Sequence, residues 1–194
     1  MPTSNSRIFK LRVLYGKQHM QLIKNYTKKS KMPLDLKSTS GCNIVKNLKQ
    51  RRFTMAKLIA FYSRADENYF GGQYRYVKVG NTEKVAKMIS DLTGADMFKI
   101  EQKVPYSANY KECVAQSVKD LKSKARPELV SLPNLDDYDE IYLGYPNYCG
   151  TMPMAVYTFL EAFDFTGKTI HPFCTHEGSG LSNTVNDIKN TAKG

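Results

Sequence analysis

Residues 140–163 read EIYLGYPNYCGTMPMAVYTFLEAF, and this stretch carries the clearest structural signal in the chain. Residues 140–144 predict a β-strand, and residues 153–163 predict an α-helix. Glycine and proline punctuate the segment between them, so we expect a loop that carries Tyr145 and Tyr148. A strand joined to a helix by a short loop is the repeating unit of α/β proteins.

The same alternation recurs on both sides of this stretch. Residues 58–62 form a continuous apolar run, which is typical of a strand buried on both faces of a sheet. The other expected strands are residues 97–100 and 169–174, and the other expected helices are residues 83–92, 109–124 and 181–193. Four strands that alternate with four helices predict an α/β fold with a doubly wound, open parallel sheet and helices on both faces.

Apolar residues at helical spacing predict which helix faces are buried. In the first helix, which Gly94 should close, these residues are Val85, Met88, Ile89 and Leu92. In the second helix they are Val114, Val118 and Leu121. The chain stops at Gly194, where a fifth strand would begin, so we expect a C-terminally truncated domain.

The positive charge lies at one end of the chain. Residues 1–54 hold 13 of the 29 Lys and Arg residues and one of the 18 acids, a net charge of +12, so residues 55–194 carry −1. The first segment also lacks a sustained apolar period, which predicts disorder. We interpret residues 1–54 as a start-site artefact or dispensable tail preceding Met55. The alternatives are a basic arm for nucleic acid or anionic lipid, or a transit peptide.

Composition excludes several classes of protein. No run approaches the length of a membrane span, and charges interrupt the apolar residues near the N-terminus, so neither a membrane segment nor a signal peptide is expected. The four cysteines form no Cys-x-x-Cys pair, so neither a metal site nor a redox dithiol is indicated. We expect reduced thiols in a cytoplasmic protein.

Ligands of open parallel sheets bind beyond the carboxyl ends of the strands. The first strand ends at Ser63 and Arg64, and the following helix starts at Gly80, Asn81 and Thr82. Hydroxyls, a guanidinium and a helix N-terminus together favour a phosphate group. The alternative is that Asn81 or Thr82 only caps the helix. Neither a dinucleotide fingerprint nor a nucleoside-triphosphate loop follows the first strand.

Two further loops carry candidate binding residues. After the third strand come Pro146, Asn147, Tyr148, Cys149 and Gly150, where an aromatic side chain in a stiff loop suits stacking on a flat ring. The alternative is that the tyrosines only anchor the loop. After the fourth strand come Thr175, His176, Glu177 and Gly178, where small residues allow a ligand to approach the backbone.

These loops together resemble a flavodoxin. The chain is similar to a bacterial flavodoxin-like subfamily in four motifs: FYSR at 61–64, VGNTE at 79–83, GYPNYCGTMPMAVYTFLE at 144–161 and PFCTHEGSGL at 172–181. The resemblance covers residues 55–194 and none of residues 1–54. It implies strand order 2-1-3-4 with the fifth strand missing. It also implies a phosphate loop formed by residues 63–64 with residues 80–82, and two loops, residues 145–152 and 174–180, that flank the ring of bound FMN.

The chain departs from this family in three ways. Tyr148 and Cys149 stand where the family often has a Trp pair, so one side of a flavin would be less covered. Residues 66–78 are inserted between the two halves of the phosphate loop, and we predict a hairpin that turns at Gly71 and Gly72. The domain, at −1, also lacks the strong negative charge of long-known flavodoxins.

The resemblance implies an electron carrier that passes electrons between redox partner proteins through FMN. An NAD(P)H-dependent quinone or flavin reductase is the alternative, and a redox-silent FMN-binding module is a third reading. No metal, membrane or nucleic-acid partner is expected for the domain.

Overall fold

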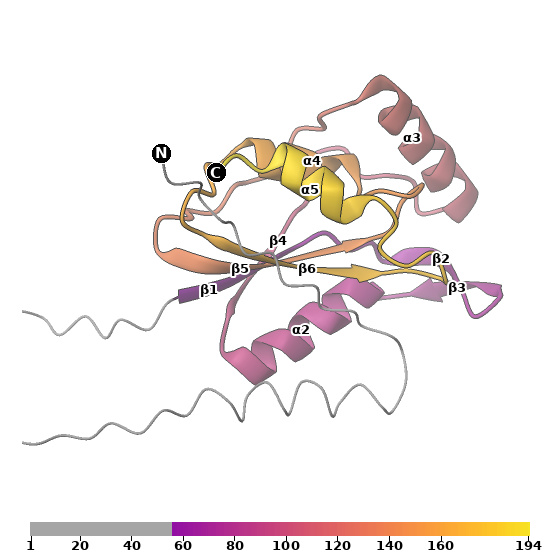
Figure 1. Ribbon diagram of the computed structural model, residues 1–194. Helices are drawn as coiled ribbons and strands as arrows, with labels where there is room; N and C mark the ends of the chain where they lie inside the picture. Colours follow the sequence, from indigo (N-terminus) through magenta and orange to yellow (C-terminus); the bar gives the residue numbers. More distant parts are fainter. Residues whose placement is uncertain (1–55) are drawn as a thin grey trace, which may run out of the picture. The chain divides into compact units, whose positions relative to one another are not determined.

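The computed structural model describes residues 56–194 (Figure 1). Interpretations of residues 1–54 therefore lie outside the described residues. The elements are, in order, β1 (Ala56–Phe61), β2 (Asp66–Phe70), β3 (Gln73–Val77), α2 (Asn81–Thr93), β4 (Asp96–Lys99), α3 (Tyr110–Ser123), β5 (Tyr138–Pro146), α4 (Met154–Glu161), β6 (Thr169–Thr175) and α5 (Thr184–Thr191).

The main sheet has four parallel strands in the order β4-β1-β5-β6. Counted along the chain without the β2–β3 hairpin, this is the predicted order 2-1-3-4. Helix α2 lies on one side of the sheet, and α4 and α5 lie on the other (Figure 1). The predicted doubly wound α/β fold is therefore confirmed.

The core lies between the sheet and helices α4 and α5. Its largest fully buried side chains include Ile141 and Tyr145 from β5, Phe159 and Leu160 from α4, and Ile188 from α5. Burial of such apolar side chains stabilises the fold by about 1.5–3 kcal/mol for each. Packing in the core thus fixes the position of β5 and of the start of the loop that follows it.

The buried faces of two helices differ from the predicted ones. In α2, Thr82, Val85, Ala86 and Ile89 are buried, whereas Met88 and Leu92 are 58% and 48% exposed. The buried stripe is thus centred on the small Ala86, which allows the helix to approach the sheet closely. The expectation that Met88 and Leu92 face the core was wrong.

Helix α3 also buries a different face. Cys113 and Ser117 are its buried residues, and Val114 is 37% exposed. Asn109 caps the helix by accepting a hydrogen bond from the Glu112 N–H, as an N-cap residue does. The Cys113 Sγ lies 3.9 Å from the Tyr148 hydroxyl, and the Ser117 Oγ lies 4.0 Å from the Cys149 Sγ, so this face packs against the loop after β5. Val118 and Leu121 are half-buried, and the expectation that Val114 faces the core was wrong.

Strand β5 is longer than the sequence pattern indicates. It continues through Tyr145 and Pro146, which pair with Cys174 and Thr175 of β6. Tyr145 is fully buried, so the expectation that it lies in a loop was wrong. Proline is tolerated at this position because it is the last residue of the strand.

The last helix starts later than predicted. Gly180 and Ser182 both have positive φ values, of 65° and 46°, which interrupt a right-handed helix before Thr184.

The predicted hairpin is confirmed: β2 and β3 pair antiparallel, and Gly71 and Gly72 have φ values of 62° and 75°, as a type I′ turn requires. No helix within residues 56–194 is long and apolar enough to cross a membrane.

Candidate functional site

Three loops meet at the carboxyl-terminal edge of the sheet, where the β2–β3 hairpin also lies (Figure 1). We call residues 63–64 with 80–82 the phosphate loop. Ring loop 1 is residues 145–152, the last two residues of β5 and the loop after them, and ring loop 2 is residues 174–180, the last two residues of β6 and the loop after them. The contacts between these loops determine how the predicted site residues are arranged.

The two halves of the phosphate loop pack directly against each other. The Ser63 hydroxyl accepts a hydrogen bond of 3.1 Å from the Glu83 N–H in the first turn of α2. A Cβ atom on Gly80 would lie 2.2 Å from the Ser63 Oγ and 2.4 Å from the Arg64 carbonyl oxygen. Only glycine therefore allows this approach. Ser63, which precedes the insertion in the sequence, thereby caps the N-terminus of α2, which follows it.

The first turn of α2 keeps donors for a ligand. Gly80 is the N-cap residue, and it has no side chain with which to cap the helix. Helix geometry leaves the N–H groups of Asn81 and Thr82 without partners inside the helix. The Asn81 side chain accepts a hydrogen bond from Lys84 instead of capping the backbone. Capping by Asn81 or Thr82, the alternative explanation of these residues, is therefore not observed.

The Arg64 guanidinium points toward the neighbouring loop. Its Nη1 donates to the Glu67 carbonyl oxygen, and its Nη2 donates to the carbonyl oxygens of Ser107 at 2.6 Å and Ala108 at 2.7 Å. Its Nε is buried and makes no hydrogen bond within residues 56–194. Arg64 thus holds the start of β2 and the loop before α3 in place, with one donor left over.

Direct hydrogen bonds join the three loops. The Thr82 and Thr175 hydroxyls are 2.8 Å apart and connect the phosphate loop to ring loop 2. The Asn147 side chain donates to the Gly180 carbonyl oxygen at 3.0 Å, and its N–H donates to the Thr175 carbonyl oxygen at 2.9 Å. The structure therefore brings all three predicted segments together.

Ring loop 1 contains a tight turn. The N–H and carbonyl groups of Tyr148 and Thr151 exchange two hydrogen bonds, of 2.8 and 3.0 Å. The two residues between them, Cys149 and Gly150, have φ values of 54° and 84°, as in a type I′ turn. The exposed Cys149 therefore stands at the tip of the turn in a conformation that favours glycine or asparagine.

Tyr148 is half-buried against other tyrosines. Its ring centroid lies 6.2 Å from that of Tyr62 and 6.4 Å from that of Tyr106. Its hydroxyl lies 3.9 Å from the Cys113 Sγ, and burial raises the pKa of this hydroxyl well above its ordinary value. Tyr148 is therefore held in one orientation and stays protonated at neutral pH.

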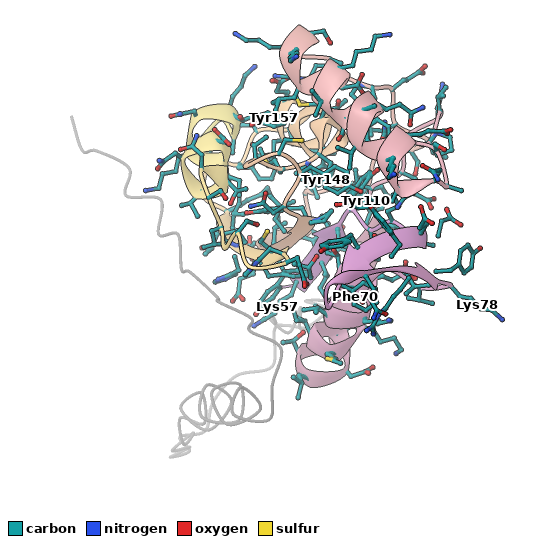
Figure 2. The ribbon with its side chains drawn as sticks, turned by 90° about the vertical axis from the view of Figure 1, so that its right-hand side faces the viewer. Lys57, Phe70, Lys78, Tyr110, Tyr148 and Tyr157 are labelled. Carbon is teal, nitrogen blue, oxygen red and sulfur yellow. The ribbon has the colours of Figure 1, made fainter. Side chains whose placement is uncertain are left out.

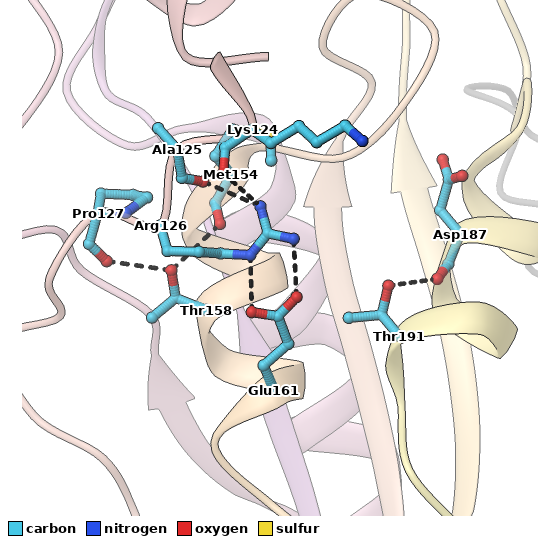
Figure 3. A network of polar contacts seen from close by, with 9 residues as sticks. All are labelled: Lys124, Ala125, Arg126, Pro127, Met154, Thr158, Glu161, Asp187 and Thr191. Carbon is cyan, nitrogen blue, oxygen red and sulfur yellow. Dashed lines mark hydrogen bonds and ion pairs between the residues drawn. The ribbon is translucent and has the colours of Figure 1, made fainter. Parts of the chain in front are cut away.

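A residue of α5 supports the other end of the turn. The Thr151 hydroxyl donates to the Asp187 Oδ2 at 2.5 Å and lies 2.7 Å from the Tyr157 hydroxyl. Because the one proton of Thr151 goes to Asp187, Tyr157 must be the donor in the second bond. Asp187 is also joined to α5 itself, since Thr191 donates to its backbone carbonyl (Figure 3).

Ring loop 2 contacts the hairpin. The Glu177 Oε1 accepts a hydrogen bond of 2.7 Å from the Gly71 N–H at the hairpin turn. The His176 Nδ1 is buried without a hydrogen-bond partner among residues 56–194, and Gly178 has a φ of 88°. The loop thus carries a second unsatisfied polar atom, after the Arg64 Nε, in a segment that the sequence singled out.

Sequence reasoning did not find Asp187 or Glu67. The Glu67 Oε2 accepts a hydrogen bond of 2.9 Å from the Tyr110 N–H, which fixes α3 against the hairpin. Each of the two acids accepts a hydrogen bond from a residue at least 36 positions away in the chain. No local pattern could have identified them. No group of three or more metal-ligating side chains occurs in the described part of the chain.

Comparison with known proteins gives one family model and several similar solved structures. The flavodoxin family model matches residues 73–194. Two similar crystal structures are each described as a “putative flavoprotein”. The one from Bacteroides eggerthii is 26% identical, with 70% of this chain and 80% of that chain covered and a TM-score of 0.56. The one from Bacteroides uniformis is 28% identical, with 70% and 81% covered and a TM-score of 0.56.

A more distant structure shares the fold. This is a flavoprotein from Lactobacillus acidophilus in complex with FMN, which is 17% identical, with 72% of this chain and 89% of that chain covered and a TM-score of 0.53. The search of curated proteins gave no match. Because the family model covers more than half of the chain, from within the hairpin to the last residue, the chain belongs to the flavodoxin family.

Proposed function

We propose that the chain binds FMN at the three loops and passes electrons between redox partner proteins. The observation that carries this proposal is the joining of the phosphate loop to ring loop 2 through Thr82 and Thr175, and of ring loop 2 to ring loop 1 through Asn147. Family membership and the FMN complex of the Lactobacillus acidophilus relative support it.

The residues present fit a phosphate group. The first turn of α2 offers N–H groups and the positive end of a helix dipole. The Arg64 Nε is a buried donor without an acceptor among residues 56–194, which a ligand could supply. The Arg64 Nη atoms already donate to backbone carbonyl oxygens. The phosphate would therefore be held mainly by backbone N–H groups and hydroxyls, and less by the Arg64 guanidinium.

The two ring loops would hold the flavin ring. We assign Pro146, Asn147, Tyr148, Cys149 and Gly150 to one side of it and Thr175, His176, Glu177 and Gly178 to the other, and the motifs of the bacterial subfamily support this assignment. When bound, FMN supplies the capacity to accept and release electrons. Tyr148, fixed by Tyr62 and Tyr106, would exclude water and so disfavour added negative charge nearby.

Comparison of FMN with riboflavin tests the proposal. Tight binding of FMN and much weaker binding of riboflavin are expected, since riboflavin lacks the phosphate. Ser63→Ala with Thr82→Ala should weaken FMN binding more than tenfold, at about 1.5–3 kcal/mol for each bond to a charged group. Thr93→Ala is the control, because its hydroxyl bonds the Ile89 carbonyl at the far end of α2. Equal affinity for FMN and riboflavin would refute the phosphate loop.

An NAD(P)H-dependent reductase of small acceptors is the second candidate. One observation favours it: the β2–β3 hairpin carries exposed tyrosines, and its turn contacts ring loop 2 through the hydrogen bond from Gly71 to Glu177. Rapid loss of the flavin absorbance on anaerobic addition of NADPH, without any partner protein, would support the reductase. No reaction with NADPH or NADH would support the carrier.

A further inference from the structure

Two thiols lie where helix α3 packs against ring loop 1. Cys113 and Ser117 are the buried residues of α3. The Cys113 Sγ lies 3.9 Å from the Tyr148 hydroxyl, and the Ser117 Oγ lies 4.0 Å from the Cys149 Sγ. In Figure 2, Tyr148 lies beside α3, in agreement with these contacts. The two cysteines therefore belong to the two sides of one contact between a helix and a loop.

Helical spacing brings the two sulfur atoms near each other. Cys113 and Ser117 are four residues apart on α3, so their Cβ atoms are about 5–6 Å apart on one face of the helix. The Cys149 Sγ, which contacts Ser117, is therefore about one helical turn from Cys113. Burial raises the pKa of the Cys113 thiol, and Cys149 is close enough to act on it electrostatically in the same direction. A disulfide requires a closer approach, so the turn that carries Cys149 would have to move toward the start of α3.

The two thiols differ in accessibility. Cys149 is exposed at the tip of the turn in ring loop 1, whereas Cys113 is buried and only 3% exposed. A Cβ atom on Gly150, the other residue at the tip, would meet no atom within 4 Å, so the tip faces open space. A small reagent would therefore reach Cys149 first, and Cys113 would react only after Cys149 has been modified.

The turn is connected to both ring loops. The Gly150 N–H donates to the Asn147 Oδ1 at 3.1 Å, and the Asn147 side chain donates to the Gly180 carbonyl oxygen in ring loop 2. Tyr148, which we assign to one side of the flavin ring, directly precedes Cys149. Movement of Cys149 toward α3 would therefore displace Tyr148 and disturb the bond that joins the two ring loops.

We propose that Cys113 and Cys149 are a redox-sensitive pair, which a low-molecular-weight disulfide such as glutathione disulfide oxidises to an intramolecular disulfide that weakens FMN binding. The Cys149 thiolate attacks one sulfur of the small disulfide, forms a mixed disulfide and releases one thiol. Cys113 then attacks the Cys149 sulfur, the mixed disulfide breaks and a second thiol leaves. The two protons of the cysteines end on the two released thiols. This inference rests on the proposed flavin site, because ring loop 1 is part of it.

FMN and the disulfide oppose each other through thermodynamic linkage. If the disulfide weakens FMN binding by some factor, bound FMN shifts the oxidation equilibrium toward the two thiols by the same factor. We expect a factor of about ten, since coupling between sites is typically about 5–150-fold. The FMN-loaded protein should therefore resist oxidation, and the protein without flavin should be oxidised more readily.

Equilibration of the full chain in anaerobic buffers of fixed glutathione and increasing glutathione disulfide, with and without saturating FMN, tests the pair. Free thiols are then blocked, and the protein is digested with trypsin without reduction and analysed by mass spectrometry. Cys42, Cys113, Cys149 and Cys174 lie in four different tryptic peptides, so the linked peptides identify the bond. We expect the peptides of Cys113 and Cys149 to be linked. Saturating FMN should raise the glutathione disulfide concentration needed for half oxidation about tenfold.

Variants separate the roles of the two thiols. Cys149→Ser should form no disulfide with Cys113 and should keep the same FMN affinity in reducing and oxidising buffers. Cys113→Ser should accumulate the mixed disulfide with glutathione on Cys149, because the second thiol is absent. Cys42→Ser is the matched control and should behave as the wild type, since Cys42 precedes Met55 and belongs neither to the pair nor to the proposed flavin site.

The linked peptides and the FMN affinity, measured on the same samples, decide the outcome. Linked peptides together with weaker FMN binding, both abolished in Cys149→Ser, support the inference. Absence of the linked peptides from the oxidised wild type overturns it, as does a disulfide that leaves the FMN affinity unchanged. An equal loss of FMN affinity in oxidised Cys149→Ser also overturns it. Failure of the reduced wild type to bind FMN would overturn the proposed function itself, whether or not the peptides are linked.

Discussion

At the scale of single residues, the site depends on close packing of backbone and small side chains. Gly80 has an ordinary extended conformation, so the need for glycine there is a matter of space and not of φ. The missing side chain lets Ser63 reach the first turn of α2. The absence of a side chain at Gly80 thus allows the two halves of the phosphate loop to pack against each other.

Gly80→Ala should destabilise the fold by about 1–3 kcal/mol through overpacking. The Arg64 carbonyl, 2.4 Å from the new Cβ, belongs to the backbone and cannot rotate away. FMN affinity should fall in parallel. Gly94→Ala, at the other end of α2, is the control: its Cβ would meet open space, so only its φ of 71° costs energy, about 1 kcal/mol, and FMN should still bind. Unaltered FMN binding by Gly80→Ala would contradict the assignment.

Asp187→Ala should loosen ring loop 1. It removes the acceptor of the Thr151 hydroxyl and should cost about 1–2 kcal/mol in denaturant unfolding, with weaker FMN binding. Asp187→Asn keeps one acceptor oxygen for Thr151 and loses the one that accepts from the Asn183 side chain, so it should retain more of both properties than Asp187→Ala does. If the Asn and Ala variants behave alike in FMN titrations, the hydrogen bond to Thr151 is not what positions the loop.

At the scale of elements, helices α3 and α4 are joined by Arg126. Its guanidinium makes two hydrogen bonds of 2.7 Å to Glu161 at the end of α4 (Figure 3). The guanidinium also lies 4.9 Å from the centroid of the Tyr157 ring. Tyr157 in turn contacts Thr151 in ring loop 1. The segment after α3 is therefore connected to the site through α4.

This ion pair predicts an acid dependence of stability. Hydrogen bonds from Arg126 lower the pKa of Glu161 below its ordinary value of 4.5. A carboxyl with a lowered pKa in the folded state stabilises the fold above the ordinary value, and this contribution is lost as the pH falls through the lowered one. Glu161→Gln should therefore cost about 0.2–1 kcal/mol near neutral pH, because both side chains are more than one third exposed.

Urea unfolding of the wild type and of Glu161→Gln at a series of pH values measures this effect. The difference in unfolding free energy should shrink as the pH falls below 4.5. A difference that stays constant across this range would show that Glu161 acts through packing and not through its charge.

At the scale of the whole molecule, charge separates two parts of the chain. Residues 1–54 carry +12 and residues 55–194 carry −1, and the strands and helices from Ala56 onward form a sheet with its own core. We therefore propose residues 55–194 as the FMN-binding domain and residues 1–54 as a dispensable extension.

A chain that begins at Met55 should bind FMN with the affinity of the full chain. The core of the described domain is formed by residues after Met55, so its loops should keep their arrangement. Flavin titration and thermal unfolding of the two proteins measure this. Loss of FMN binding in the shorter chain would show that the basic segment contributes to the site. If the segment binds nucleic acid, that binding should weaken steeply with salt.

The sequence alone predicted the order of strands and helices, the hairpin at Gly71 and Gly72, and the fold class. These features depend on properties of short segments of sequence: the periodicity of apolar residues, glycines that adopt positive φ values, and short connections between elements. The three loops could be identified because the carboxyl ends of parallel strands must lie at one edge.

The tertiary structure decided which side chains meet within that frame. It placed Tyr145 in the core, buried Ala86 in place of Met88, and turned the Arg64 guanidinium toward Ser107 and Ala108. Thr82 meets Thr175 across 93 positions of the chain, because β6 and the start of α2 reach the same edge. Such contacts depend on the register between strands and on packing of helices against the sheet, and local periodicity contains neither.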